Sequence, residues 1–250
     1  MKELHIGDIT SSHGEADATV SFVGGGDLNY DIQDLPSTNI IDLFAQSNDF
    51  CKPHNIILFK CQAGMSRSCA FLVAYLIGVE SLSLKDALSY CKNIRPQMSI
   101  NKGFMYQLQL YEAMKGEIDI WNPEYRKFKA WITLQNREQS KVVTTDFGKD
   151  PEQLDKLPDL PIIKCKQCRR KLAIFMKGFD HQKCGGSIVV EPLAWMEVTE
   201  LQGKLNCPRC NHKIGFYLWQ GRQCSCGNFV APYFTLSPNK VDIFQKLNLF

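Results

Sequence analysis

The clearest apolar pattern in the chain is a short unbroken run followed, after a glycine-containing segment, by a longer one. The run Asn55-Ile-Ile-Leu-Phe59 has the length of a buried strand. The run from Ser68 to Ile77 has the length of a helix. The segment Lys60 to Ser68 therefore connects a buried strand to a helix.

Weaker apolar patterns follow in the second half of the chain. The runs Ser187–Val190 and Asn228–Val230 predict small β-sheets, and residues 125–134 predict one more short helix. The longest apolar run, Ala70 to Val79, is too short to span a bilayer, and the N-terminus has no signal-peptide pattern. We therefore expect no membrane association.

The connecting segment contains the groups needed to hold and attack a phosphate. Gly64 allows a tight loop whose backbone N–H groups point inward beside a helix N-terminus, which is a geometry that binds a dianion. The same positive field lowers the pKa of Cys61, so that it can be a thiolate nucleophile. Arg67 can grip two phosphoryl oxygens with its planar fork. The predicted phosphate-binding residues are Gln62, Ala63, Gly64, Met65, Ser66 and Arg67.

These residues resemble the dual-specificity protein phosphatases, within the cysteine-dependent protein tyrosine phosphatase superfamily. The resemblance continues through Ala74–Ile77, Arg95-Pro96, Ile100–Phe104 and Gln107-Leu108, and covers residues 1–115. It implies an α/β domain with a central sheet flanked by helices. It also implies a two-step reaction in which the cysteine thiolate attacks phosphorus, an aspartic acid protonates the leaving oxygen, and water hydrolyses the phosphocysteine. Cys61, Arg67, Ser68 and one aspartate would be the catalytic residues.

Two aspartates are candidates for the acid. The family places this residue on a loop before the cysteine, and Asp34, with Pro36 two residues later, matches its Asp-x-Pro variant. Asp31 is the alternative, and either residue could simply cap a turn. One departure concerns the residue before the nucleophile, which is usually histidine and is Lys60 here. A cation is kept, whereas the hydrogen bonding of the histidine is not.

Cysteines dominate the chemistry of the C-terminal part. Seven of the eleven cysteines follow residue 160, several of them in Cys-x2-Cys pairs. This spacing lets both sulfurs of a tight turn reach one zinc ion. The expected ligands of two structural zinc ions are Cys165, Cys168, His181, Cys184, Cys207, Cys210, Cys224 and Cys226. Such thiolate-rich sites leave no position for water, and they indicate a reducing compartment.

The pairing of these ligands has alternatives. Cys207, Cys210, Cys224 and Cys226 would form one four-thiolate site. The remaining three cysteines would take His181 as fourth ligand, with His212 as the alternative. The cysteine-containing turns could also be shared between the two zinc sites in a crossed arrangement.

Charge divides the chain in the same way. Residues 161–250 carry 13 Lys and Arg against 5 Asp and Glu, a net +8, whereas residues 1–115 and 116–160 have net charges of −3 and −2. We therefore expect a phosphatase domain at 1–115, an extension and acidic linker at 116–160, and a small β-rich zinc-binding domain at 161–250. Basic charge suits RNA or an acidic ribosomal surface, although it could also be only a solvated face.

The zinc motifs, with Glu191-Pro192 and Trp195-Met196, make the resemblance specific. They resemble the eukaryotic subfamily with a C-terminal zinc-binding domain that is implicated in maturation of the large ribosomal subunit. This implies a cytoplasmic and nuclear protein that acts on phosphotyrosine and phosphoserine or phosphothreonine of phosphoproteins, and whose zinc domain engages pre-60S particles or rRNA. The alternative function is an assembly factor that works mainly through the zinc domain.

Overall fold

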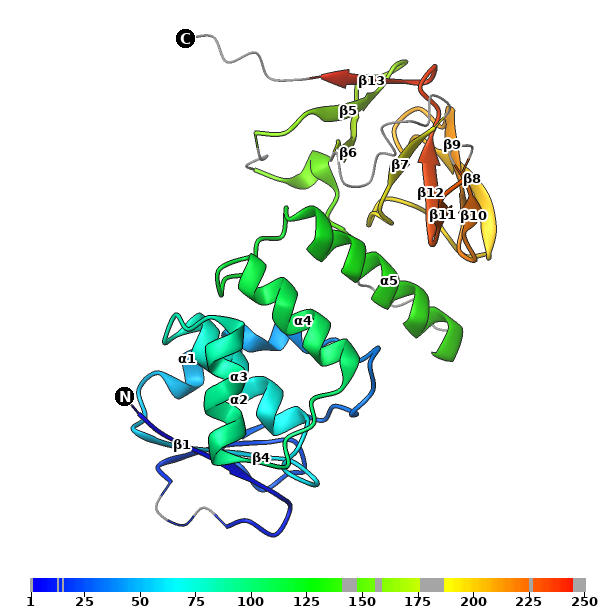
Figure 1. Cartoon of the computed structure of the whole chain (residues 1–250). Helices are drawn as coiled ribbons and strands as arrows, with labels where there is room; N and C mark the ends of the chain where they lie inside the picture. The colour runs from blue at the N-terminus through cyan, green and yellow to red at the C-terminus, as the bar shows by residue number, and fades with distance from the viewer. Residues whose placement is uncertain are drawn as a thin grey trace, which may run out of the picture. The chain divides into compact units, whose positions relative to one another are not determined.

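The computed structural model divides the chain into two compact units, Met1–Asp119 and Ile120–Phe250, and each is described by itself (Figure 1). The description covers residues 2–12, 14, 16–140, 148–155, 159–175, 187–224 and 227–244, without the side chains of 136–140.

The first unit contains a parallel sheet of four strands in the order β1-β4-β2-β3. Its strands are β1 (Glu3–Gly7), β2 (Ala18–Ser21), β3 (Leu28–Asn29) and β4 (Ile56–Lys60). Strand β4 lies between β1 and β2, and this central position explains its continuous apolar run. The predicted strand at 55–59 is confirmed, with both ends one residue later.

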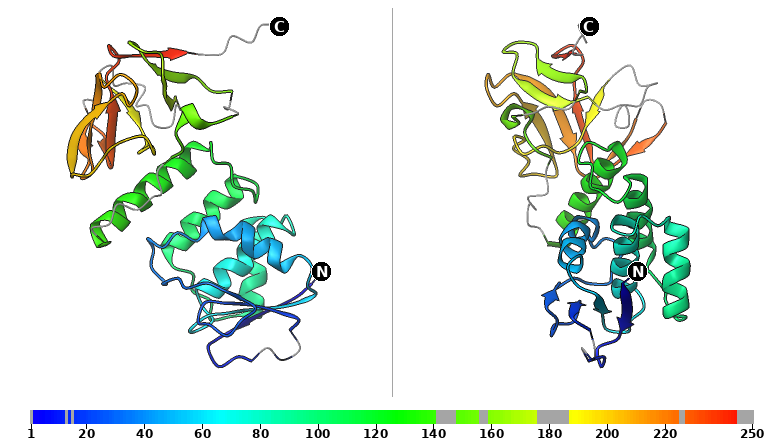
Figure 2. Two further views of the ribbon diagram at one scale, coloured as in Figure 1. Left: turned by 180° about the vertical axis from the view of Figure 1, so that it is seen from behind. Right: turned by 90° about the vertical axis from the view of Figure 1, so that its left-hand side faces the viewer.

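Four α-helices of the first unit lie on one side of this sheet (Figure 1; Figure 2). They are α1 (Phe44–Cys51), which follows the short η1 (Ile41–Leu43), α2 (Arg67–Gly78), α3 (Leu84–Ile94) and α4 (Lys102–Ala113). Helix α2 packs against α1, α3, α4 and β4, and every residue from Ser68 to Ile77 is buried. Complete burial explains why α2 is apolar all round.

Among the described helices, none combines the length and apolar composition that a membrane span requires.

The second unit begins with one long helix and continues as antiparallel sheets. Helix α5 (Pro123–Ser140) includes the predicted short helix, and η2 (Pro151–Gln153) follows it. The strands are β5 (Ile162–Cys165), β6 (Lys171–Ile174), β7 (Ile188–Val190), β8 (Gln202–Asn206), β9 (Lys213–Leu218), β10 (Arg222–Gln223), β11 (Phe229–Val230), β12 (Tyr233–Leu236) and β13 (Val241–Phe244). They form sheets in the orders β13-β5-β6, β7-β12-β9-β8 and β10-β11. The apolar runs at 187–190 and 228–230, which were predicted to be strands, contain β7 and β11.

A hydrophobic core joins the two larger sheets of the second unit. Trp219 is buried edge-on against Phe234, with ring centroids 5.0 Å apart, and Tyr217 stacks on the same ring at 5.3 Å. Leu134 of α5 belongs to this core. The second unit therefore has apolar packing of its own beside any metal that it binds.

The sequence predicted an extension and acidic linker at 116–160, and two of its residues form buried ion pairs with later parts of the second unit. Arg126 of α5 forms a buried ion pair with Glu191. Asp150 pairs with Arg170 at 2.6 Å, also buried. These carboxylates have partners that are distant in the sequence, so composition alone could not reveal them. Residues 141–147 and 156–158 of the expected linker lie outside the described residues.

Candidate active site and candidate metal centre

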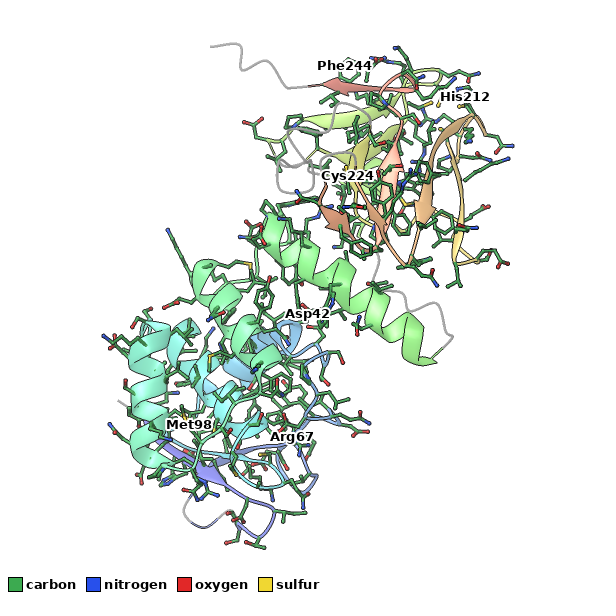
Figure 3. The ribbon with its side chains drawn as sticks, turned by 45° about the vertical axis from the view of Figure 1, so that its right-hand side comes forward. Asp42, Arg67, Met98, His212, Cys224 and Phe244 are labelled. Atoms are coloured by element: carbon green, nitrogen blue, oxygen red, sulfur yellow. The ribbon has the colours of Figure 1, made fainter. Side chains whose placement is uncertain are left out.

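The segment between β4 and α2 forms a tight loop that begins at Cys61 and ends at Arg67, the first residue of α2 (Figure 3). Gly64 has a φ of +64°, and a Cβ there would lie 2.8 Å from the carbonyl oxygen of Gly7 and 2.8 Å from Arg95 Nη2. Only glycine fits this conformation and this space. The glycine thus permits the curvature that turns the loop amides inward.

Cys61 has the environment of a thiolate. Its side chain is 2% exposed, and Sγ lies 3.2 Å from Ser68 Oγ. Burial raises the pKa of Cys61, but hydrogen bonds from the Ser68 hydroxyl and from the N–H groups of Ser68, Met65 and Gly64 outweigh it, and the net pKa is lowered. The structure thus brings Cys61, Ser68 and the loop amides together around one sulfur.

Two other buried cysteines of the first unit differ from Cys61 in this respect. Burial raises the pKa of Cys51 to about 12. A hydrogen bond with Cys69, together with burial, raises the pKa of Cys91. Both thiols therefore stay neutral at physiological pH and act as small core residues, whereas Cys61 is poised to ionise.

Arg67 is oriented by the backbone around it. Its Nη1 donates to the carbonyl oxygens of Phe22 and Ile32, both at 3.0 Å. Its Nε is buried and has no hydrogen-bond partner among the described residues. A buried N–H without a partner is costly in a protein interior, and a phosphoryl oxygen would satisfy it. This geometry fits the predicted phosphate clamp.

Asp34 lies at the opposite end of the loop from Cys61. Its Oδ1 accepts hydrogen bonds from Ser66 Oγ at 2.8 Å and from Asn101 Nδ2 at 2.5 Å. Asn101 also caps α4, since its Oδ1 accepts from Phe104 N at 2.9 Å. The alternative acid, Asp31, is exposed and makes no side-chain hydrogen bond or ion pair within the part of the chain that is described. The geometry therefore favours Asp34 as the residue held beside the phosphate loop.

Sequence reasoning assigned no role to Arg95, although the structure gives it one. Arg95 Nε donates to the carbonyl oxygen of Gly64 and Nη2 to that of Ala63, both at 3.0 Å. These carbonyls point out of the loop toward Arg95, which leaves the loop amides free to point inward. The Arg95-Pro96 pair carried part of the family resemblance, but its spacing from Cys61 gives no sign of this contact.

Helix α4 holds the segment that carries Asp34. A Cβ on Gly103 would lie 2.0 Å from the carbonyl oxygen of Pro36, so only glycine allows this approach. The fully buried Gln107 accepts hydrogen bonds from the N–H groups of Ile40 and Ile41 through Oε1, at 2.8 and 3.0 Å. These contacts fix both ends of the segment that follows Asp34.

Lys60, the departure from the family pattern, is the last residue of β4 and is 8% exposed. It lies beside Gly7 of β1 and Ser21 of β2 in the sheet. Its Nζ is 3.8 Å from the point where a Cβ on Gly25 would lie. The cation is therefore buried next to a glycine-rich turn.

The two Cys-x2-Cys pairs meet in the second unit. The Sγ atoms of Cys165, Cys168, Cys207 and Cys210 lie within 4.8 Å of one another. The Cys165–Cys210 and Cys168–Cys207 sulfurs are 3.7 and 3.5 Å apart. Four thiolates bound to one tetrahedral zinc ion at about 2.3 Å would be about 3.8 Å apart. The cluster fits a closed structural zinc site.

The two pairs fold into equivalent turns. The N–H of Arg169 donates to the carbonyl oxygen of Cys165 at 2.9 Å, and that of Asn211 donates to Cys207 at 2.8 Å. Arg169 and Asn211 both have a positive φ, of 65° and 55°. One turn connects β5 to β6 in the three-stranded sheet. The other turn connects β8 to β9 in the four-stranded sheet of the second unit. A metal ion here would therefore fasten the two sheets together.

This grouping corrects the first pairing expected from the sequence and corresponds to the crossed arrangement. Cys207 and Cys210 share a cluster with the earlier pair, not with Cys224. Cys224 is buried and lies apart from His212, which follows the second turn (Figure 3). Spacing identifies the cysteines of one turn, whereas the strand arrangement decides which turns share an ion. His181, Cys184 and Cys226 lie outside the described residues.

The loop of this α/β domain carries a buried cysteine whose pKa is lowered, a guanidinium and inward-pointing amides, and these groups suit the binding of a phosphate. A family model described as dual specificity phosphatase, catalytic domain, matches residues 19–114. Tyrosine-protein phosphatase YVH1 of Saccharomyces cerevisiae is 32% identical in an alignment that covers 86% of this chain and 77% of the relative. The chain therefore belongs to the dual-specificity protein phosphatases, and it carries a phosphoric monoester hydrolase domain.

Further relatives agree with this family. Tyrosine-protein phosphatase yvh1 of Schizosaccharomyces pombe is 30% identical, covering 86% of this chain and 70% of the relative. Human dual specificity protein phosphatase 12 is 31% identical over 74% of this chain. The chain spans 63% of the length of that human relative.

Proposed function

We propose that the chain is a protein phosphatase that hydrolyses phosphotyrosine as well as phosphoserine and phosphothreonine through a phosphocysteine intermediate. The observation that carries this proposal is the contact of Cys61 with Ser68 at the base of a loop whose Arg67 leaves a buried Nε for an anion.

In the first step, the Cys61 thiolate attacks phosphorus while Arg67 and the loop amides bind the phosphoryl oxygens. The S–P bond forms as the bond from phosphorus to the substrate oxygen breaks. The Asp34 carboxylic acid gives a proton to that oxygen, because an alkoxide or phenoxide is a poor leaving group. Its hydrogen bonds to Ser66 and Asn101 place the carboxyl group beside the loop.

In the second step, water attacks the phosphocysteine and the S–P bond breaks. The Asp34 carboxylate takes one proton from the water, and inorganic phosphate leaves. The sulfur departs as a thiolate, which the Ser68 hydroxyl stabilises by donating a hydrogen bond. Enzyme and acid are then ready for the next turnover.

Asp34→Asn is expected to slow hydrolysis of phenyl phosphate, which has a poor leaving group, by roughly 10²–10³-fold. Hydrolysis of 4-nitrophenyl phosphate should slow far less, because its leaving group hardly needs a proton. The measurement is kcat for both substrates. Asp31→Asn is the matched control and should leave both rates unchanged. Equal losses for the two substrates in Asp34→Asn would assign the acid elsewhere.

We also propose two structural zinc ions. The first fits the cluster of Cys165, Cys168, Cys207 and Cys210. Four of the predicted ligands then remain for a second ion: His181, Cys184, Cys224 and Cys226. Both sets are complete with four ligands and leave no open position for water, so the ions would stabilise the fold without taking part in catalysis.

For the second unit we propose a targeting role, in which it binds pre-60S ribosomal particles or their rRNA in the cytoplasm and nucleus. The support is the net charge of +8 over residues 161–250, about +5 once two zinc ions and seven thiolates are counted. The alternative is an assembly factor in which this unit performs the main task and phosphatase activity is secondary.

Association with pre-60S particles should survive Cys61→Ser and be lost in Cys207→Ser, which disrupts the cysteine cluster. It should also weaken as salt increases, because phosphate contacts release counterions. Sedimentation of the full chain with particles on sucrose gradients measures this. Association retained by Cys207→Ser would contradict the targeting role. Growth restored by Cys61→Ser in cells that lack the protein would favour the assembly-factor alternative.

A further inference from the structure

The first unit exposes few large apolar side chains, and they are not evenly distributed. Among its described residues, the four that are more than a third exposed are Ile9, Leu35, Ile94 and Tyr106. Ile9 and Leu35 belong to segments that are hydrogen-bonded to the phosphate loop, and Ile94 precedes Arg95, which braces that loop. Three of the four therefore lie in segments that contact or brace the phosphate loop.

Ile9 is fastened to the beginning of the loop. Its N–H donates to the carbonyl oxygen of Gln62, the residue after the nucleophile, at 3.3 Å. Two residues earlier, the Gly7 carbonyl accepts from Cys61 N at 3.2 Å. The backbone of Ile9 is thus held against the loop while its side chain is 50% exposed.

Leu35 is fastened to the other end of the loop. It follows Asp34, whose carboxylate accepts a hydrogen bond from Ser66, and it precedes Pro36, which packs against Gly103. Its side chain is nevertheless 42% exposed. Exposed apolar residues are therefore fastened beside both ends of the loop that would hold the phosphate.

Two carboxylates, Asp8 and Asp31, lie in the segments that carry Ile9 and Leu35. Hydrogen bonds from the hydroxyl and N–H of Thr10 lower the pKa of Asp8, and Arg95 lies 3.9 Å from its carboxylate. Asp31 is a further exposed carboxylate in the segment that carries Leu35. Acidic residues beside the phosphorylated residue would be repelled here, whereas apolar residues would bury surface against Ile9 and Leu35.

We propose that Ile9 and Leu35 form the surface that binds the residues flanking the phosphorylated residue, and that the preferred phosphoprotein segment carries large apolar side chains there. This specificity rests on the phosphatase function proposed above. It gives the substrate class of the enzyme: phosphopeptides with apolar, not acidic, residues next to the phosphate.

Three phosphotyrosine peptides that differ only in the two flanking residues test this: Leu, Ser or Asp on both sides. The unmodified protein should hydrolyse the Leu peptide roughly tenfold more efficiently than the Ser peptide, mainly through a lower KM, and the Asp peptide least. In Ile9→Ser and in Leu35→Ser, the Leu-over-Ser ratio of kcat/KM should fall severalfold toward one. Tyr106→Ser, an equally exposed side chain on α4, is the matched control and should keep the ratio.

The outcomes separate this specificity from the phosphatase function itself. No hydrolysis of any aryl phosphate or peptide would overturn the proposed function. Hydrolysis of 4-nitrophenyl phosphate with equal kcat/KM for the Leu and Ser peptides, or a preference for the Asp peptide, would overturn the apolar surface alone. For Leu35→Ser, a lower kcat on phenyl phosphate with an unchanged peptide ratio would mean that Leu35 only positions Asp34, and would remove it from the surface.

Discussion

Cys61→Ser is expected to reduce hydrolysis of 4-nitrophenyl phosphate by roughly 10⁴-fold or more, because a serine hydroxyl at this position stays protonated and cannot replace the thiolate. Ser and Cys have almost the same shape, so the fold should be unchanged. The measurements are kcat for the full-length protein, its melting curve and its zinc content.

Cys51→Ala is the matched control. Cys51 is also buried in the first unit, but its pKa is raised to about 12, so it supplies no thiolate. This variant should lose some stability because of the small cavity and should keep its turnover. Substantial hydrolysis by Cys61→Ser, or loss of hydrolysis in a folded Cys51→Ala, would assign the nucleophile to another residue.

The pH profile gives a finer test of the same thiolate. Ser68→Ala removes the hydroxyl that donates to Cys61 Sγ, so the pKa of Cys61 should rise. The reaction needs the thiolate, and activity falls as the pH drops through this pKa. The acidic limb of kcat/KM should therefore move to higher pH in Ser68→Ala. A limb that stays in place would mean that Ser68 does not set this pKa.

Cys207→Ser is expected to remove one of two zinc ions per chain and to lower the melting temperature of the second unit by more than about 10 °C. The cause is loss of one of the four thiolates through which a zinc ion would fasten the β5–β6 turn to the β8–β9 turn. The full chain is measured by metal analysis and calorimetry. Hydrolysis of an aryl phosphate by the first unit should continue.

His212→Ala is the matched control for the metal site. His212 follows the second turn directly but does not belong to the four-cysteine cluster, so this variant should keep both ions. Full zinc content in Cys207→Ser would refute the ligand assignment. A zinc content of one or none in the unmodified protein would refute the proposed pair of sites.

The strand β4, the loop and helix α2 could be predicted because they depend on neighbouring residues. The buried strand β4 has an apolar run, the buried residues of α2 after Ser68 are almost all apolar, and Gly64 allows the turn between them. The Cys-x2-Cys turns were visible for the same reason, since both ligands of each turn lie within four residues. In each case the local sequence contains the physical cause of the structure.

Contacts between distant residues were decided only by the tertiary structure. The sequence favours Asp34 over Asp31 only through the Asp-x-Pro pattern, and the structure adds the contacts of Asp34 with Ser66 and Asn101. Arg95 reaches the carbonyl of Gly64 from a helix that ends 30 residues further along the chain. Residue spacing carries no information about such contacts, because they depend on how helices and strands pack.

The same division holds in the second unit. Its sequence by itself predicted Cys-x2-Cys turns that suit a metal ion, because thiolate spacing is a local property. The tertiary structure decided that the turn at Cys165 shares a cluster with the turn at Cys207, because two separate sheets bring them together. It also decided that α5 belongs to this unit, because the buried charge of Arg126 requires the distant partner Glu191.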